Sequence, residues 1–317
     1  MYHTPVLLKE VISLIKLHPG DNVIDATLGG GGHAQAMLEQ ISPDGKLIGF
    51  DLDPAAIKHC KKHLVQFKSR IHLFQKNYIE IKKVYNEQFS DHTIRAILLD
   101  LGLSSYELKD ESRGFSFLNE SAPLDMRMSG KGKTAAELLN TLSKKDLIQI
   151  LSEYGQEPYT SQIAEEVNRL RQKQKFYKVG DLAAAVLRVY KNKLHSNKSK
   201  PWIGGTHPAT RTFQALRIAV NDELKNLSTV LKRALNVLAP GGRMAVISFH
   251  SLEDRVVKRY FMEESRNCIC PPEVPVCRCG HKAKVKRITK KAIVADQDEI
   301  KVNNRSRSAR LRVIEKI

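Results

Sequence analysis

Long apolar runs and scattered cysteines are both missing from this sequence of 317 residues. No stretch approaches the roughly 18 apolar residues that a membrane-spanning helix needs. The N-terminal segment, with His3, Lys9 and Glu10, is patterned as an amphipathic helix and not as a secretory signal. Four of the five cysteines lie between Cys268 and Cys279, which is unlike a disulfide framework spread over a secreted domain. We therefore expect a cytoplasmic protein with no membrane partner.

Acidic residues are also few relative to basic ones. There are 34 Asp and Glu against 52 Lys and Arg, which gives a formal net charge of +18. This surplus favours a polyanionic partner, because each phosphate that a basic side chain neutralises releases a condensed counterion. Nucleic acid is the expected partner, and a generally basic, soluble surface is the alternative.

The first hundred residues alternate between short apolar strands and helices. Such a strand–helix rhythm indicates an α/β fold whose parallel sheet is covered by helices on both faces. The expected strands cover residues 22–26, 46–50, 71–74 and 96–100.

After Asp100 the pattern becomes helical for about a hundred residues. Helices are expected at 134–140, 144–153, 161–170 and 179–190, followed by a polar, basic linker at 191–201. A long helix at 210–238 and strands at 243–249 and 309–314 complete the chain. We therefore expect one discontinuous α/β domain, residues 1–106 and 206–317, with a helical domain inserted at 107–205.

A glycine-rich turn at residues 27–32 separates the first strand from the first helix of the sheet domain. Such a turn presents backbone N–H groups and a helix N-terminus to an anionic ligand. Asp51 ends the second strand, where a carboxylate can accept both hydroxyls of a ribose. The glycines do not form the G-x-G-x-x-G pattern of nicotinamide-binding folds. Asp25 could meet the amine of S-adenosylmethionine, which favours a methyltransferase; a tight turn without a ligand is the alternative.

Two more side chains follow neighbouring strands. Asp100 ends the fourth strand, beside the point where such sheets bind ligands, and could face a cofactor or a substrate. Its alternative role is the N-cap of a following helix. Tyr78 follows the third strand and could cover an adenine ring or belong to the core.

Six motifs occur in a fixed order along the chain. Together they resemble the family of ribosomal RNA small subunit methyltransferase H, the 16S rRNA (cytosine-N4) methyltransferases, and the likeness runs from HTPVLL (3–8) to RSARLR (307–312). The motifs are DATLGGGGH (25–33), DLGLSS (100–105), RGFSF (113–117), PLDMRM (123–128), HPATRTFQA (207–215) and ISFHSLEDR (247–255).

The resemblance implies a class I S-adenosylmethionine-dependent methyltransferase with an inserted helical domain for substrate recognition. It further implies methylation of the cytidine at position 1402 of 16S rRNA in the small ribosomal subunit, and a homodimer is possible. Glu107 stands where the family usually has glutamine. The cofactor contacts that the resemblance implies are Gly31, Gly32, His33, Asp51, Tyr78, Asp100 and Glu107.

The chemistry of an exocyclic amine suggests a role for Asp100. The lone pair of the amine is delocalised into the ring, and an acceptor for one N–H can localise it as the amine attacks. Many amino-methyltransferases place an Asn/Asp/Ser-Pro-Pro-Tyr motif after the fourth strand, but this chain has DLGLSS there. We therefore hypothesise that Asp100, or a group of the following turn, is that acceptor; the competing view makes Asp100 a cofactor ligand only.

The base must leave its stack to react, so a substrate pocket is expected. For each candidate, core packing or a structural ion pair is the alternative. Basic residues at 191–200 and 305–312 could contact phosphates. The candidate pocket residues are Arg113, Phe115, Phe117, Arg127, Arg211 and His250.

The cysteine cluster is open to two interpretations. Four thiolates, or three and His281, could hold a zinc ion, but the C-x-C spacing is tighter than in ordinary structural zinc sites. We expect a metal-free loop.

Three rival functions also remain: another nucleic-acid amino-methyltransferase, a nicotinamide-dependent oxidoreductase and a non-catalytic RNA-binding module.

Overall fold

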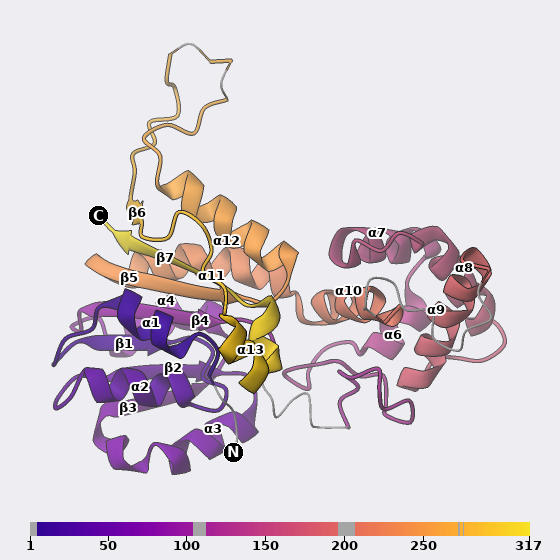
Figure 1. Ribbon diagram of the computed structural model, residues 1–317, viewed down its shortest axis with the longest axis horizontal. Helices are drawn as coiled ribbons and strands as arrows, with labels where there is room; N and C mark the ends of the chain where they lie inside the picture. The colour runs from indigo at the N-terminus through magenta and orange to yellow at the C-terminus, as the bar shows by residue number, and fades with distance from the viewer. Residues whose placement is uncertain (1–4, 104–111, 196–206, 272, 275) are drawn as a thin grey trace. The chain divides into compact units, whose positions relative to one another are not determined.

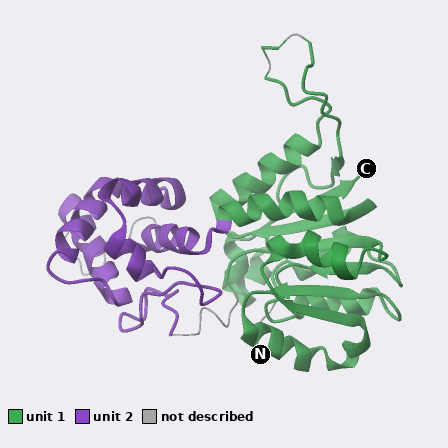
Figure 2. Ribbon diagram, turned by 180° about the vertical axis from the view of Figure 1, so that it is seen from behind, with its two compact units in different colours: residues 1–104, 224–317 green, residues 105–223 purple. Residues whose placement is uncertain are grey.

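The computed structural model describes residues 5–103, 112–195, 207–271, 273–274 and 276–317. The chain forms two compact units, residues 1–104 with 224–317 and residues 105–223 (Figure 2). Among the described residues, no helix combines the length and the apolar composition that crossing a bilayer requires.

The first unit is built on a seven-stranded sheet in the order β3-β2-β1-β4-β5-β7-β6. Neighbours among β1 to β5 run parallel, as predicted, whereas β7 is antiparallel to both β5 and β6. The reason is that Arg310, which begins β7, lies opposite Ser248 at the carboxyl end of β5, so the strand must run back along it. The strands are β1 (Asn22–Asp25), β2 (Leu47–Asp51), β3 (Ile71–Gln75), β4 (Ile94–Asp100), β5 (Leu238–Ser248), β6 (Val285–Arg287) and β7 (Arg310–Lys316).

Both faces of this sheet are covered, as the apolar strands predicted. Successive residues of a strand point to opposite faces, so Ile97 and Leu98 of β4 belong to two different apolar cores. One core lies under α4 (Ile81–Gln88), α11 (Glu223–Val237) and α12 (Ser251–Glu264). The other lies under α1 (Leu8–Ile15), α2 (Gly32–Gln40) and α3 (Pro54–His63), and Figure 1 shows the helices on both sides of the sheet. The short α13 (Gln297–Val302) precedes β7.

The second unit is helical in its described part and has an apolar core of its own. Thr134 and Glu137 form a capping box at the start of its first helix, as a T-x-x-E sequence predicts. Its helices are α6 (Ala135–Thr141), α7 (Lys144–Gly155), α8 (Thr160–Arg171), α9 (Val179–Lys193) and α10 (Ala209–Asn221).

The single long helix expected at 210–238 is wrong. The chain breaks between α10 and α11 at Asp222, whose φ of 51° is left-handed. Helix α10 buries Phe213 and Leu216 in the core of the helical unit, and it packs so closely on α7 that a Cβ at Gly155 would lie 2.8 Å from the Arg211 carbonyl oxygen. The second unit boundary therefore falls after residue 223 and not after the expected residue 205.

The basic linker expected at 191–201 begins later than predicted. Helix α9 continues to Lys193, because its apolar face still buries Val189 and Tyr190 in the helical core. Residues 196–201 lie outside the described residues.

Candidate active site

The glycine turn after β1 requires glycine at two positions. Gly31 precedes α2 with a φ of +79°, and a Cβ there would lie 2.9 Å from the sulfur of Cys60. A Cβ at Gly32 would lie 3.0 Å from Cδ of Pro5. Neighbouring side chains pack closely against this turn. Glycine fits at both positions because its side chain is a single hydrogen atom.

Asp51, at the carboxyl end of β2, is fixed by backbone amides. Gly29 donates its N–H to Oδ2 at 2.8 Å, and Asp53 donates to Oδ1 at 2.8 Å. Burial raises the pKa of Asp51 to about 6, although these N–H groups work in the opposite direction. The carboxyl group is thus held in one orientation beside the glycine turn.

Asp25, at the end of β1, is buried with half of its carboxyl group unpaired. Oδ1 accepts the backbone N–H of Thr27 at 3.1 Å, whereas Oδ2 has no hydrogen-bond partner among the described residues. Burial raises the pKa of Asp25 to about 7, and the neighbouring Asp51 raises it further.

Asp100, at the end of β4, is in the same situation. Its backbone N–H donates to Oγ1 of Thr27 at 2.6 Å, and its Oδ2 lies 3.6 Å from Nδ1 of His33. In the part of the chain that the structure describes, Oδ1 is buried with no hydrogen-bond partner. Burial raises the pKa of Asp100 to about 8; Asp25 adds to this effect and the positive charge of Arg305 opposes it.

These carboxylates lie where a ligand is expected. Strands β1 and β4 are neighbours at which the strand order reverses, and α/β sheets bind their ligands at that point. A buried acceptor without a donor destabilises the fold unless a ligand supplies the donor. Asp25 Oδ2 and Asp100 Oδ1 therefore fit a ligand that carries N–H or O–H groups, and the glycine turn lets it approach the backbone.

The structure brings most of the predicted cofactor residues together. Gly31 and Gly32 form the turn that begins α2, and His33 follows them, with Nε2 3.0 Å from the carbonyl oxygen of Val6. Asp51 and Asp100 lie at the ends of strands on either side of β1.

The other two predicted residues are Tyr78 and Glu107. Tyr78 begins a short 3-10 turn after β3, is partly buried, and packs against the core that contains Phe50 and Ile81. Glu107 lies outside the described residues.

Two residues of this site were missed from the sequence. Thr27 joins β1 to β4, because its N–H binds Asp25 and its hydroxyl accepts from Asp100. Cys60 packs beneath the turn and directs its thiol at the carbonyl oxygen of Gly29 at 3.4 Å. The sequence signal for Thr27 is its place two residues after a strand-ending aspartate; Cys60, a lone cysteine on a helix, has none.

Several candidates for the substrate pocket have structural partners within their own unit. Arg127 forms a two-pronged ion pair with Asp125, with both distances 2.7 Å. Arg211 donates to the carbonyl oxygen of Gln156 at 2.9 Å, and the Phe117 ring stacks on His207 with centroids 4.6 Å apart. These contacts favour the structural alternative.

The remaining candidates also have defined surroundings. Phe115 packs against the helical core and Arg113 is half-buried. His250 is the N-cap of α12 and forms a capping box with Glu253. In the basic tail, Arg312 is buried and donates from Nε and Nη2 to the two carboxylate oxygens of Asp254, at 2.7 and 3.0 Å. This arginine therefore belongs to a structural ion pair and does not present a surface contact for phosphate.

Comparison with known proteins places these features in a family. Ribosomal RNA small subunit methyltransferase H of Heliobacterium mobile is 44% identical over 317 residues, covering 100% of this chain and 99% of that protein. The protein of the same name from Carboxydothermus hydrogenoformans is 44% identical over 316 residues, covering 99% and 98%. The crystal structure of an rRNA methylase from Streptococcus thermophilus is 13% identical with a TM-score of 0.38, covering 98% of this chain and 92% of that one. The model of the MraW methylase family matches residues 1–317, and the chain belongs to that family.

Proposed function

We propose that this protein transfers a methyl group from S-adenosylmethionine to the N4 amine of a cytidine in 16S rRNA of the small ribosomal subunit, at position 1402. The observation that carries the proposal is a pair of buried carboxylate oxygens beside the glycine turn, on Asp25 and Asp100, for which the described residues offer no hydrogen-bond donor. Family membership and the names of the full-length relatives support the same activity.

The residues of the first unit fit the parts of the cofactor. S-adenosylmethionine, when bound, supplies an electrophilic methyl group on a sulfonium. Asp25 Oδ2 can accept from its ammonium group, and Asp51 keeps lone pairs for ribose hydroxyls after accepting two backbone N–H groups. Tyr78 can cover the adenine ring, and Gly31 and Gly32 form the turn that begins α2 beside these carboxyl groups.

Asp100 is the proposed acceptor for the reacting amine. Its Oδ1 has no donor among the residues that the structure describes, and its backbone is fixed by Thr27, so the carboxyl is pre-oriented. A hydrogen bond from one N–H of the cytosine amine would localise the lone pair toward the methyl group. The proton that the amine loses becomes acidic only as the new N–C bond forms, so Asp100 needs no strong basicity. A role in cofactor binding alone is the competing assignment.

The substrate side rests on charge and on the chemistry of a stacked base. A net charge of +18 favours contact with the phosphate backbone, and the target base must be turned out of its stack to meet the methyl group. We assign recognition of the RNA to the helical unit. A homodimer remains a prediction.

The test is methyl transfer to small ribosomal subunits isolated from a strain that lacks this enzyme. We expect labelled N4-methylcytidine in the 16S rRNA, identified by mass spectrometry of the nucleosides. Labelled N6-methyladenosine would instead identify another amino-methyltransferase. Calorimetry with S-adenosylhomocysteine is the companion measurement, because a protein that binds RNA but not this compound would be an RNA-binding module without catalysis.

A further inference from the structure

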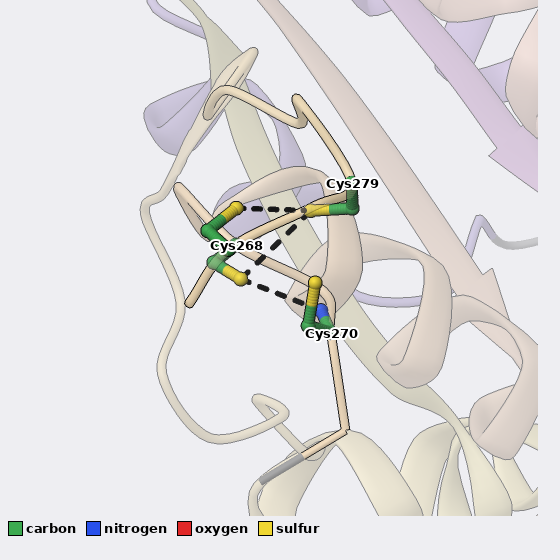
Figure 3. Close-up of side chains that lie close together, drawn as sticks. Cys268, Cys270 and Cys279 are labelled. Atoms are coloured by element: carbon green, nitrogen blue, oxygen red, sulfur yellow. Dashed lines mark hydrogen bonds between the residues drawn. The ribbon is translucent and has the colours of Figure 1, made fainter. Parts of the chain in front are cut away.

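Four cysteines that the proposed methyl transfer does not use meet in one loop. They are arranged as two C-x-C pairs between α12 and β6, and their four sulfur atoms all lie within 4.8 Å of one another. The sulfur of Cys279 is 3.6 Å from that of Cys277 and 3.8 Å from that of Cys268. Figure 3 shows the sulfur atoms of Cys268, Cys270 and Cys279 turned toward one another. All four thiols are free, so no disulfide accounts for their proximity.

Backbone amides point at these sulfur atoms. Cys279 accepts N–H groups from Ile269 and His281, each at 3.5 Å. Cys268 accepts from the amide of Cys270 at 3.4 Å, and Cys270 accepts from the amide of Arg278 at 3.5 Å. An N–H donor stabilises a thiolate more than a thiol, and metal ligands are oriented by such contacts from the surrounding chain.

The loop has no apolar core that could hold the thiols together. We call residues 262–284 the cysteine loop; between the buried Phe261 and Val285, none of its described residues is buried. Its large apolar side chains are exposed, Ile269 by 47% and Val276 by 69%. Figure 1 shows this segment as a long loop that leaves the first unit between α12 and β6. A segment this short and this poor in apolar contacts usually needs a covalent or metal cross-link to keep one conformation.

The base of the cysteine loop is fixed by the protein itself. Lys284 donates its backbone N–H to the carbonyl oxygen of Glu264 at 2.8 Å, and its ammonium group lies 2.8 Å from the Glu264 carboxylate. His281 is also bound at the base, with Nε2 3.1 Å from the carbonyl oxygen of Glu263. Among the described residues, the ligand atoms that lie within 4.8 Å of one another in this loop are the four sulfur atoms, and the imidazole of His281 is not one of them.

We propose that Cys268, Cys270, Cys277 and Cys279 bind one Zn²⁺ ion as a tetrahedral site of four thiolates. A Zn–S distance of about 2.3 Å places tetrahedral thiolates about 3.8 Å apart, which agrees with the separations of the Cys279 sulfur from those of Cys277 and Cys268. Four soft sulfur ligands select zinc over magnesium or calcium, and a cluster of several irons would hold its thiolates farther apart.

The charge around the thiols suits such a site. A zinc ion with four thiolates carries a net charge of −2. The cysteine loop has four basic side chains against three glutamates, a surplus of one positive charge, and Lys284 is paired with Glu264. A site closed by four protein ligands leaves no position for a substrate, so its role is to fold the loop. The basic side chains of the loop are Arg266, Arg278, Lys282 and Lys284.

Metal analysis of the full-length protein, prepared under reducing conditions without chelator, tests the proposal. We expect about one zinc per chain in the native protein and in the control Cys60→Ala, which removes the one cysteine outside the loop. The double variant Cys268→Ser/Cys279→Ser should retain less than a tenth of that zinc. Equal zinc in all three proteins would overturn the proposal, as would native protein without stoichiometric zinc.

Spectroscopy identifies the ligands and the metal. Cobalt in place of zinc should give the visible absorption of a tetrahedral thiolate site in the native protein and none in the double variant. Visible absorption from iron in the protein as isolated would overturn the assignment to zinc, and disulfides between the loop cysteines in protein kept under reducing conditions would overturn the site.

Limited digestion with trypsin measures the structural role. Removal of zinc should make cleavage at Arg266, Arg278 and Lys282 at least tenfold faster, while binding of S-adenosylhomocysteine by the rest of the chain is retained. If the double variant binds S-adenosylhomocysteine as well as the native protein does, the rest of that variant is folded. Unchanged cleavage after the metal has been removed would contradict a zinc-dependent fold of the loop.

Discussion

At the carboxyl edge of the sheet, Asp25 and the Oδ1 atom of Asp100 are buried at the ends of strands that pack between two apolar cores. The thiols of the cysteine loop, in contrast, lie largely exposed. The first site has its geometry before a ligand arrives, because packing holds the strands. The second has ligands in the right number but little except the proposed metal to hold them. Side-chain packing therefore fixes the geometry of the carboxylate site, and metal coordination would fix the geometry of the thiolate site.

Truncation of an apolar side chain should give the largest difference in stability between the two regions. Leu98→Ala, in the strand that ends at Asp100, removes a fully buried side chain and should lower the free energy of unfolding by about 2–5 kcal/mol. Val276→Ala in the cysteine loop should change it by less than about 0.5 kcal/mol. Denaturant unfolding measures both values, and similar losses would show that the loop has a core of its own.

Replacement of the Asp100 carboxyl group tests whether the buried site takes part in the chemistry. Asp100→Asn should slow methyl transfer by about 100-fold, because an amide is a weaker acceptor for the cytosine amine. The measurement is the single-turnover rate at saturating S-adenosylmethionine, with the exposed Asp91→Asn as the control. An unchanged rate would leave Asp100 as a cofactor ligand only.

Two glycines with positive φ allow a matched comparison of crowding. Gly31 has a φ of +79° and Cys60 beneath it, whereas Gly280 in the cysteine loop has a φ of +61° and nothing within 4 Å of an added Cβ. Both valine variants carry backbone strain, but only Gly31→Val adds a steric clash. We expect about tenfold weaker binding of S-adenosylhomocysteine for Gly31→Val and no change for Gly280→Val, measured by calorimetry. Equal losses would mean that crowding is not what requires glycine in the turn.

The last comparison concerns a dependence on pH that the carboxyl groups of the buried site should produce. An exposed aspartate titrates near 3.8, but Asp25 and Asp100 keep their protons up to about pH 7 and 8 in the folded protein. The folded state thus binds more protons than the unfolded chain between these values, and the free energy of unfolding falls as pH rises from about 4 to 8.

Binding of a ligand with a positively charged group should instead favour the ionised form of the buried carboxyl groups. The ammonium group of S-adenosylhomocysteine favours the ionised form of Asp25, so its dissociation constant should decrease a few-fold between pH 6 and 8, with release of protons. Calorimetry in buffers of different ionisation enthalpy measures that release. The variant Asp25→Asn should lose most of the pH dependence; if it does not, another group is responsible.

Much of the fold could be predicted from the sequence. Strands of a parallel sheet that is covered on both faces must be apolar on both sides, so they occur in the sequence as short apolar runs. Strand β4 is an example, since Ile97 and Leu98 serve opposite cores and so both must be apolar. The break at Asp222 could not be predicted, because the apolar spacing of α10 and α11 continues across it. The direction of β7 was also missed, since a short apolar run does not say which way its strand lies.

The candidate site was predictable where glycine and aspartate occupy fixed places at strand ends. Asp51 and Asp100 were found in this way, and the structure places them at the expected edge. For Thr27, the local sequence signals only the N–H bond to Asp25, because its bond to Asp100 depends on two strands meeting in space. For the cysteines the C-x-C spacing favoured a metal-free loop, whereas the distances between the sulfur atoms favour a metal.

The interruption between β4 and β5 has a consequence for biosynthesis. The two strands are neighbours in the sheet, yet the whole helical unit, residues 105–223, is translated between them. On the ribosome, β4 therefore emerges as an edge strand with unpaired backbone groups, a position that invites pairing with other chains. Fast folding of the helical unit, whose contacts are local, would shorten the time for which that edge stays open.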